Sequence, residues 1–241
     1  MDWREEGILI GTRRYGENSV IVELFFKKKG RHLGVVRGGS SKKLNPILQL
    51  GNQLDAHWRA RLEDHLGSFS IDLVKSRASL IMMDRSALAG LSSVCGLLNF
   101  CLPEREGNER LYDKTFNLLE AIASNKQWFL DYLSWELTLL EELGFGLDLS
   151  SCAVTGSLKN LKYISPKSAR AVSFKGAGEW SNRLLPLPKC FLGLDYGKED
   201  LMQGFFVTGY FLENKVASSI GQKLIPGSRN RLIELIRQFE S

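Results

Sequence analysis

The stretch LDAHWRARL at residues 54–62 decides the fold of the first third of the sequence. Every second position in it is apolar, namely Leu54, Ala56, Trp58, Ala60 and Leu62. The positions between them are polar, namely Asp55, His57, Arg59 and Arg61. A period of two is that of a β-strand with one face in the core and the other in water. We therefore expect a half-buried strand here, with Trp58 packed in the core.

Four neighbouring segments share this period of two. They carry Ile8, Ile10 and Thr12; Val20, Val22, Leu24 and Phe26; Leu33 and Val35; and Phe69, Ile71 and Leu73. The connections YGEN (15–18) and KKKGR (27–31) have the composition of hairpin turns, and Gly34 predicts a bulge or a sharp bend. Five short strands with a longer connection after the third predict a small closed barrel such as the OB-fold. An SH3-like barrel fits equally well, and the pattern does not separate the two.

From residue 79 the apolar period becomes helical. Helices are expected at 80–101, with Ile81, Leu88, Leu91, Cys95 and Leu98 near one face, and at 108–123, 127–144, 199–213 and 228–239. Gly144 is expected to end the third of these, and Ser228 to cap the last, which buries Leu232, Leu235, Ile236 and Phe239. The sequence thus predicts an α+β protein, with a five-stranded OB-fold barrel at 1–78 and a helical domain at 79–241. A loop-rich, basic insertion is expected at 149–189 within the helical domain.

The sequence lacks the residue motifs of several enzyme classes. The four cysteines form no C-x-x-C pair, and the three histidines have no metal-ligand partner at helical spacing. Gly34, Gly38 and Gly39 do not complete a phosphate-binding loop, and no nucleophile elbow occurs. We predict that the protein is not an enzyme and binds no cofactor.

The apolar runs are too short for a membrane span, and the first residues, MDWREEG, are acidic where a signal peptide would be basic and then apolar. A cytoplasmic protein without membrane contact is expected.

The charge of the chain is unevenly distributed. Residues 1–77 contain 14 Lys and Arg against 9 Asp and Glu, whereas residues 78–241 contain 18 of each. Within that neutral remainder, 104–148 is acidic and 149–189 is basic. Cationic charge concentrated in a small barrel is typical of a polyanion binder such as a nucleic-acid-binding protein.

The candidate phosphate contacts lie at strand ends, in turns and on the polar face of the fourth strand. The first group is Arg37, Lys42, Lys43, Arg59 and Arg61; the second is Arg13, Arg14, Lys27, Lys28, Lys29 and Arg31. A further candidate basic patch consists of Lys159, Lys162, Lys167 and Arg170. The alternative is a protein-interaction adaptor, in which the basic barrel binds an acidic protein partner and DNA binding is incidental.

Four segments resemble the bacterial recombination mediator RecO, and the likeness covers nearly the whole chain. They are VVRGGSSKK (35–43) with the following LQLG (48–51), LPEREGNERLYD (102–113), WELTLLEELGFGLDLSSC (135–152) and YISPKSARAVS (163–173). The resemblance implies an OB-fold, a helical domain and a zinc-ribbon-like excursion in a DNA repair and recombination protein. It implies binding of single- and double-stranded DNA, strand annealing and, with RecR, loading of RecA onto DNA coated with single-strand binding protein.

The resemblance also implies partners and a location. The partners are RecR, the acidic C-terminal tail of the single-strand binding protein and, through an indirect interaction, RecA. The location is the nucleoid within the cytoplasm. Lys159, Lys162, Lys167 and Arg170 are candidates either for a second DNA contact or for that acidic tail.

One departure from the family concerns zinc. Zinc-bearing members place two C-x-x-C pairs around the excursion, and the matching positions here are Cys152 with Thr155 and Ser173 with Gly176. One thiol of four remains, whereas structural zinc sites use four ligands. We expect that the zinc site is lost and that packing and hydrogen bonds hold this region.

Overall fold

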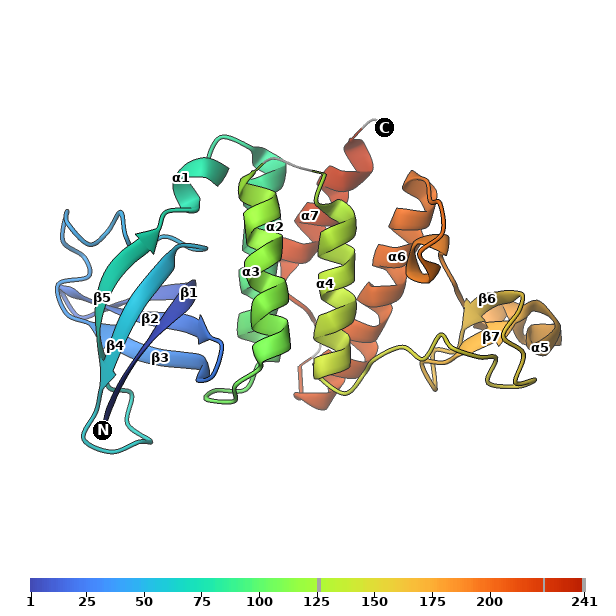
Figure 1. Ribbon diagram of the computed structural model, residues 1–241, viewed down its shortest axis with the longest axis horizontal. Helices are drawn as coiled ribbons and strands as arrows, with labels where there is room; N and C mark the ends of the chain where they lie inside the picture. Colours follow the sequence, from blue (N-terminus) through green and yellow to red (C-terminus); the bar gives the residue numbers. More distant parts are fainter. Residues whose placement is uncertain (125–126, 223, 240–241) are drawn as a thin grey trace. The chain divides into compact units, whose positions relative to one another are not determined.

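The computed structural model describes residues 1–124, 127–222 and 224–239 (Figure 1). The chain divides into two compact units. The first is Met1–Trp128 with Pro226–Leu232, and the second is Phe129–Ile225 with Ile233–Ser241. The first unit therefore contains the barrel together with the helices that follow it directly.

The first unit is built on a closed five-stranded barrel. Its strands are β1 (Asp2–Tyr15), β2 (Ser19–Phe26), β3 (Gly30–Val36), β4 (Gln53–Arg59) and β5 (Ser68–Lys75). They follow one another around the barrel in the order β1-β2-β3-β5-β4, and β4 pairs with β1 to close it. All pairs are antiparallel except β3 with β5, where Val35 lies opposite Ser68. This is the strand order of an OB-fold, which confirms the predicted fold class.

Trp58 lies in the barrel core, as the period of its strand predicts. Its side chain is 1% exposed, and its Nε1–H donates to the Leu66 carbonyl at 3.1 Å. Alternate residues of the strands surround it: Leu9, Val20, Val22, Leu24, Phe26, Val36, Leu54, Ala56 and Phe69. The predicted inward face of β4 ends early, because Leu62 lies beyond the strand and is 52% exposed.

The phase predicted for β3 was wrong. Leu33 and Val35 are only half-buried, and the residues that face the core are His32, Gly34 and Val36. The His32 ring packs edge-on against Trp3 and Trp58, with centroids 5.1 and 4.9 Å away. A histidine and a glycine occupy buried positions of β3, whereas the apolar residues Leu33 and Val35 lie on the face turned away from the core.

Gly34 is not the site of a bulge. It pairs with Val22 in unbroken register, and the irregularities lie between Leu9 and Gly11 and between Gln53 and Leu54. The bulge in β1 accompanies a change of partner, since the first half of this strand pairs with β4 and the second half with β2.

Both faces of β1 are buried at its centre. Leu9 points into the barrel, whereas Ile8 and Ile10 are buried outside the barrel core. Helix α2 (Arg85–Cys101) packs against this strand, and its Asn99 amide donates to the Ile10 carbonyl at 2.8 Å. Thr12, predicted on the face of Ile8 and Ile10, is exposed.

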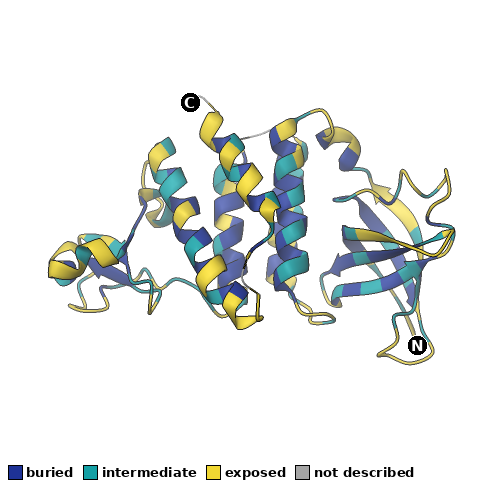
Figure 2. Cartoon of the chain, turned by 180° about the vertical axis from the view of Figure 1, so that it is seen from behind, coloured by how far each residue is buried: buried dark blue, intermediate teal, exposed yellow. Residues whose placement is uncertain are grey.

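The helix expected at 80–101 is interrupted. A short helix α1 (Ala78–Ile81) precedes α2, and the Asp84 carboxylate caps α2 by accepting from the backbone N–H groups of Ser86 and Ala87. The phase of α2 differs at Leu88, which is 46% exposed. Helix α3 (Glu109–Ala123) follows, and the dark blue parts of the barrel strands and helices in Figure 2 mark the buried residues.

Arg77 links the barrel to α3 within the first unit. Its buried guanidinium donates to Glu120 at 2.8 Å and to the Gly51 carbonyl at 3.0 Å, and it lies over the Phe116 ring. A buried arginine is stable here because most of its donors have partners.

The second unit is built on α4 (Phe129–Glu142) and α6 (Lys198–Phe211), which continues as a π-helix η3 (Leu212–Ala217). Gly144 ends α4 at φ +81°, as predicted, and the Phe145 N–H donates to the Leu140 carbonyl at 2.8 Å.

Helix α7 (Gly227–Gln238) begins one residue before Ser228, so the predicted cap was wrong. Among the described residues, the buried Ser228 hydroxyl has no hydrogen-bond partner. Leu232 and Ile236 are buried as predicted, whereas Phe239 is 48% exposed.

The region predicted as a loop-rich insertion contains a small sheet in the order β7-β6-β8. Its strands are β6 (Leu161–Ile164), β7 (Ala171–Ser173) and β8 (Leu185–Pro186). The helix α5 (Phe174–Ala177) and the 3-10 helix η1 (Gly178–Arg183) connect β7 to β8, and the 3-10 helix η2 (Lys189–Leu192) follows β8. Cys152, Val172 and Ala177 form its own small core. No helix in the described ranges of the chain has the length and apolarity needed to cross a membrane.

Candidate nucleic-acid interface

Five of the predicted cations meet at one end of the barrel. Arg14 pairs with Val20 across β1 and β2, and Val20 pairs with Val36 across β2 and β3, directly before Arg37. The Ser40 N–H donates to the Asn18 carbonyl at 3.4 Å, which joins the β3–β4 connection to the β1–β2 turn. We call this group the basic loop end, and its cations are Arg13, Arg14, Arg37, Lys42 and Lys43.

The β3–β4 connection is firmly seated on the barrel. Gly38 turns the chain at φ +69°, and a helical turn follows, in which the Leu48 N–H donates to the Leu44 carbonyl at 3.0 Å. Leu48 is buried in the barrel core, and Leu44 packs against it. Apolar side chains of this connection therefore anchor it, while Lys42 and Lys43 are exposed.

The charges of the basic loop end are unneutralised. In the described part of the chain, none of its five cationic side chains makes a hydrogen bond or an ion pair. The segments 13–19 and 37–48 contain a single carboxylate, on Glu17. Guanidinium and ammonium groups at the end of β1 and in the β3–β4 connection can each contact a backbone phosphate of DNA.

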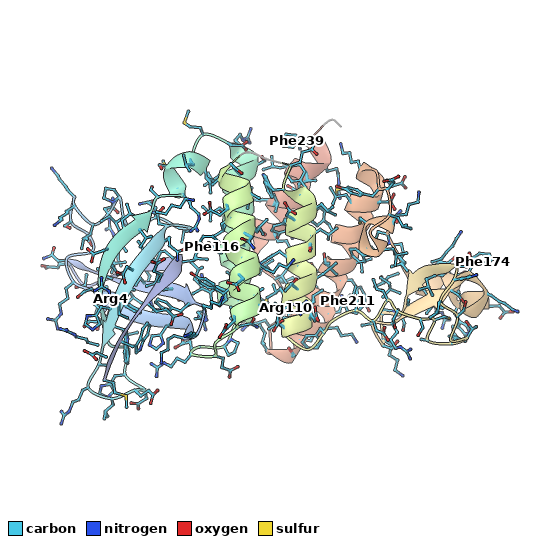
Figure 3. The ribbon with its side chains drawn as sticks, viewed as in Figure 1. Arg4, Arg110, Phe116, Phe174, Phe211 and Phe239 are labelled. Atoms are coloured by element: carbon cyan, nitrogen blue, oxygen red, sulfur yellow. The ribbon has the colours of Figure 1, made fainter. Side chains whose placement is uncertain are left out.

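Arg59 is the last residue of β4, and Arg61 lies in the β4–β5 connection that follows it. Arg59 is 3.7 Å from the Asp2 carboxylate. Arg4, labelled on the barrel in Figure 3, forms an ion pair with Asp55 on the same strands and lowers the pKa of that carboxyl group. Carboxylates alternate with cations on this face of the barrel, so its charge is mixed.

The cluster Lys27 to Arg31 is largely engaged with its own chain. Lys27 pairs with Asp113 at 2.8 Å, and the Lys29 ammonium lies 5.7 Å from the centre of the Trp3 ring. The Arg31 side chain is 16% exposed, donates to the Leu102 carbonyl at 2.9 Å and pairs with Glu23 at 3.2 Å. Sequence reasoning grouped these cations with the others, but Arg31 holds segment 102–104 against β3.

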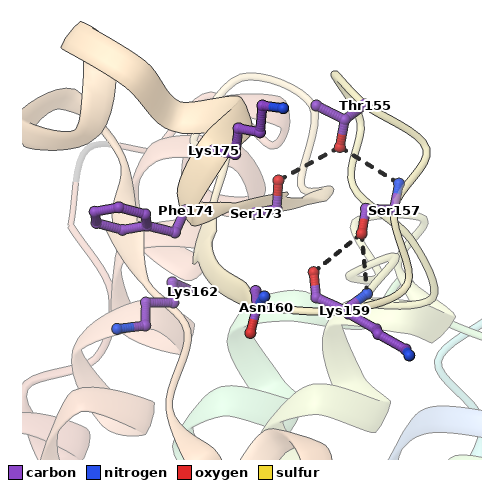
Figure 4. A pocket seen from close by; sticks show the side chains of 8 residues that line it. All are labelled: Thr155, Ser157, Lys159, Asn160, Lys162, Ser173, Phe174 and Lys175. Carbon is purple, nitrogen blue, oxygen red and sulfur yellow. Dashed lines mark hydrogen bonds between the residues drawn. The ribbon is translucent and has the colours of Figure 1, made fainter.

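The second predicted patch divides in the same way. Lys159 and Lys162 line a cavity of about 570 Å³ in the small sheet of the second unit (Figure 4). The other lining residues are Thr155, Ser157, Asn160, Ser173, Phe174 and Lys175. Lys167 does not line it, and Arg170 pairs with Asp148 at 3.1 Å.

Sequence reasoning missed Phe174 and Lys175 as members of this cavity. Phe174 directly follows a buried strand, and no periodic signal shows that its ring is exposed.

The four positions that match family zinc ligands do converge. Ser173 donates to the Cys152 sulfur through its backbone N–H at 3.2 Å and its hydroxyl at 3.3 Å, and the Thr155 N–H donates at 3.4 Å. A β-carbon on Gly176 would lie 2.9 Å from the same sulfur. Burial raises the pKa of the Cys152 thiol, but these hydrogen bonds outweigh it and lower the pKa to about 6.

This donor set does not fit zinc. It offers one thiolate, two hydroxyl groups and a glycine without a side chain, whereas structural zinc takes four thiolate or imidazole ligands. Across the described ranges, His, Cys, Asp and Glu form no group of three that could hold a metal ion. Hydrogen bonds to the Cys152 sulfur connect positions that bind zinc in zinc-bearing members of the family.

Comparison with known proteins agrees with this architecture. The family model described as Recombination protein O N terminal matches residues 1–77, and the one described as Recombination protein O C terminal matches 82–223. The DNA repair protein RecO of Jannaschia sp. is 53% identical over 238 residues, covering 99% of this chain and 97% of that protein. The DNA repair protein RecO of Roseobacter denitrificans is 54% identical over 235 residues, covering 97% and 98%. The chain belongs to the RecO family of DNA repair proteins.

Proposed function

We propose that this DNA repair protein binds single- and double-stranded DNA through the basic loop end and anneals complementary strands. The observation that carries the proposal is the set of five cations at the end of β1 and in the β3–β4 connection of an OB barrel, which have no partner among the described residues. The β1–β2 loop, which the β3–β4 connection adjoins here, is one of the oligonucleotide-binding loops of this fold. Counterion release from the DNA backbone supplies the binding free energy, and no bond-making chemistry or cofactor is involved.

Annealing follows from charge neutralisation. Two complementary strands repel each other through their phosphates, and a protein that neutralises these phosphates lets the strands approach and pair. With RecR, the protein helps load RecA onto DNA coated by single-strand binding protein, whose acidic tail is attracted to basic groups of this chain. These roles place the protein at the nucleoid in the cytoplasm.

Titration of a labelled single-stranded oligonucleotide and of its duplex at several salt concentrations tests the proposal. If five phosphates are contacted, the logarithm of the single-strand association constant should fall with the logarithm of salt concentration with a slope of about −3.5. Absence of binding at low salt would contradict DNA binding and favour an adaptor that binds an acidic protein.

The partner roles need separate measurements. A mixture with RecR should elute from a sizing column ahead of either protein alone. Two complementary strands that carry a donor and an acceptor dye should pair faster with this protein than without it. Energy transfer between the dyes measures the rate of pairing. Separate elution of RecR at micromolar concentrations would contradict the proposed complex.

A further inference from the structure

We propose that the cavity of the small sheet, lined by residues 155–162 and 173–175, holds one nucleotide of single-stranded DNA, with its base stacked on Phe174. This inference rests on the proposed DNA-binding function and adds a second contact on a separate unit of the chain. It assigns a role to Phe174 and Lys175, neither of which belongs to the basic loop end.

The Phe174 ring is presented as an open stacking surface. Phe174 is 63% exposed, although it directly follows the buried Ser173. The Phe174 N–H donates to the Asn160 carbonyl at 3.0 Å, and Asn160 adopts φ +56° to bring that carbonyl into place. An exposed aromatic ring on a fixed backbone suits a base, because every base has a flat face to stack on it.

The charge around this ring suits a phosphate backbone. Lys159, Lys162 and Lys175 line the cavity, and its lining contains no carboxylate. The Lys162 ammonium lies over the Phe174 ring, 5.5 Å from its centre (Figure 4). In the described structure, none of the three ammonium groups has an ion-pair partner.

The floor of the cavity is rigid and polar. Ser173 is 3% exposed, and its hydroxyl is fixed between the Cys152 sulfur and the Gly176 N–H, which donates to it at 3.1 Å. Ser157 is held by hydrogen bonds to and from the Lys159 backbone at 3.2 Å. Within the described residues, the Asn160 side-chain amide has no partner and can contact a base edge.

The lining favours a nucleotide over an acidic peptide. Phe174 is its only large apolar side chain, and it offers a flat ring and not an enclosed pocket for an apolar side chain. Three lysines beside one ring match a unit with one base and flanking phosphates, which is the repeating unit of a single strand.

Abasic DNA separates stacking from phosphate contact. The full chain is titrated with oligothymidine and with an oligomer of equal length that lacks bases in its central half. The wild type should bind oligothymidine at least about 5-fold more tightly, the lower end of base-stacking effects. Phe174→Ala should reduce this preference towards 1-fold without changing the affinity for the abasic oligomer, and Phe174→Tyr should retain it.

Trp180→Ala is the matched control, because Trp180 is 60% exposed, adjoins the cation of Arg183 and lies outside the cavity. An unchanged preference in Phe174→Ala, or an equal loss in Trp180→Ala, would overturn the proposal. So would an acidic peptide that displaces oligothymidine from the wild type and binds Phe174→Ala more weakly. If substitution of the basic loop end abolishes binding while Phe174→Ala does not alter it, the DNA function stands and this site fails.

Discussion

The Phe69 ring lies where any side chain on residue 34 would have to go. A β-carbon on Gly34 would be 2.4 Å from Phe69 Cδ2, well inside van der Waals contact. Phe69 is 4% exposed and enclosed by the barrel core, so its ring has little freedom to withdraw. The glycine is therefore a packing requirement of the barrel.

Gly34→Ala should lower the free energy of unfolding by about 1–3 kcal/mol, the usual cost of overpacking a core. Urea denaturation followed by tryptophan fluorescence measures it. Gly227→Ala is the control, because this glycine begins α7 with open space around its α-carbon. A Gly34→Ala variant as stable as the wild type would show that the ring can move.

Arg37→Ala/Lys42→Ala/Lys43→Ala should weaken DNA binding and flatten its salt dependence. Each lost single-strand phosphate contact removes about 0.7 from the slope, so the triple variant should lose about 2. Fluorescence anisotropy at a series of salt concentrations measures both quantities.

The control for this variant removes the same charge elsewhere. Lys114→Ala/Lys189→Ala/Lys215→Ala lies outside both basic sites and should bind with a nearly unchanged slope. Equal effects of the two triple variants would mean that net charge, and not the basic loop end, determines binding.

His32 should make the barrel sensitive to acid. Burial, followed by the charges of Arg105 and Lys29, lowers its pKa from 6.5 to about 4. The unfolded chain therefore binds a proton first, and the contribution of neutral His32 to stability, complete above pH 6.5, is lost as the pH falls through 4. The loss between pH 7 and pH 4 is roughly 2–3 kcal/mol.

Urea denaturation at several pH values compares the wild type with His32→Phe, which should show a smaller loss of stability on acidification. His65→Gln is the control, because His65 is exposed on the β4–β5 loop. Identical pH profiles of the wild type and His32→Phe would place the acid-sensitive group elsewhere.

The purified protein should contain no stoichiometric zinc, and a chelator should not change its melting temperature. Elemental analysis and a melting curve with and without the chelator check these expectations. One zinc ion per chain would overturn the view that hydrogen bonds hold this region.

Cys152→Ala should be destabilised by about 1–3 kcal/mol, because three buried or half-buried donors lose their shared acceptor. The pKa of the Cys152 thiol is lower in the folded chain than its ordinary value of 9.0. The contribution of this thiol to the free energy of unfolding is therefore complete above pH 9 and declines as the pH falls towards 6. Cys190→Ala should cost less, since that thiol makes one weak hydrogen bond at 3.6 Å.

Periodicity predicted the barrel well where one face is apolar and the other polar. The stretch around Trp58 meets that condition. It failed in β3, where His32 and Gly34 face the core, and in β1, where Ile8 and Ile10 are buried outside the barrel. In both strands the identity of the buried face depends on contacts with distant residues, which a local pattern does not contain.

The candidate site was predictable as a set of charges but not as an arrangement. The register of β1, β2 and β3 brings Arg14 and Arg37 to one end of the barrel, and turns Arg31 towards Leu102. A sequence read without the barrel register gives these arginines equal weight. Phe174 was missed because a single exposed aromatic residue produces no periodic pattern in the sequence.

Strand β1 closes the barrel, because its first half pairs with β4 and its second half pairs with β2. Loss of residues 2–8 would open the ring into a curved ribbon with two free edges, on β4 and on the remaining part of β1. Free strand edges recruit other chains and lead to aggregation.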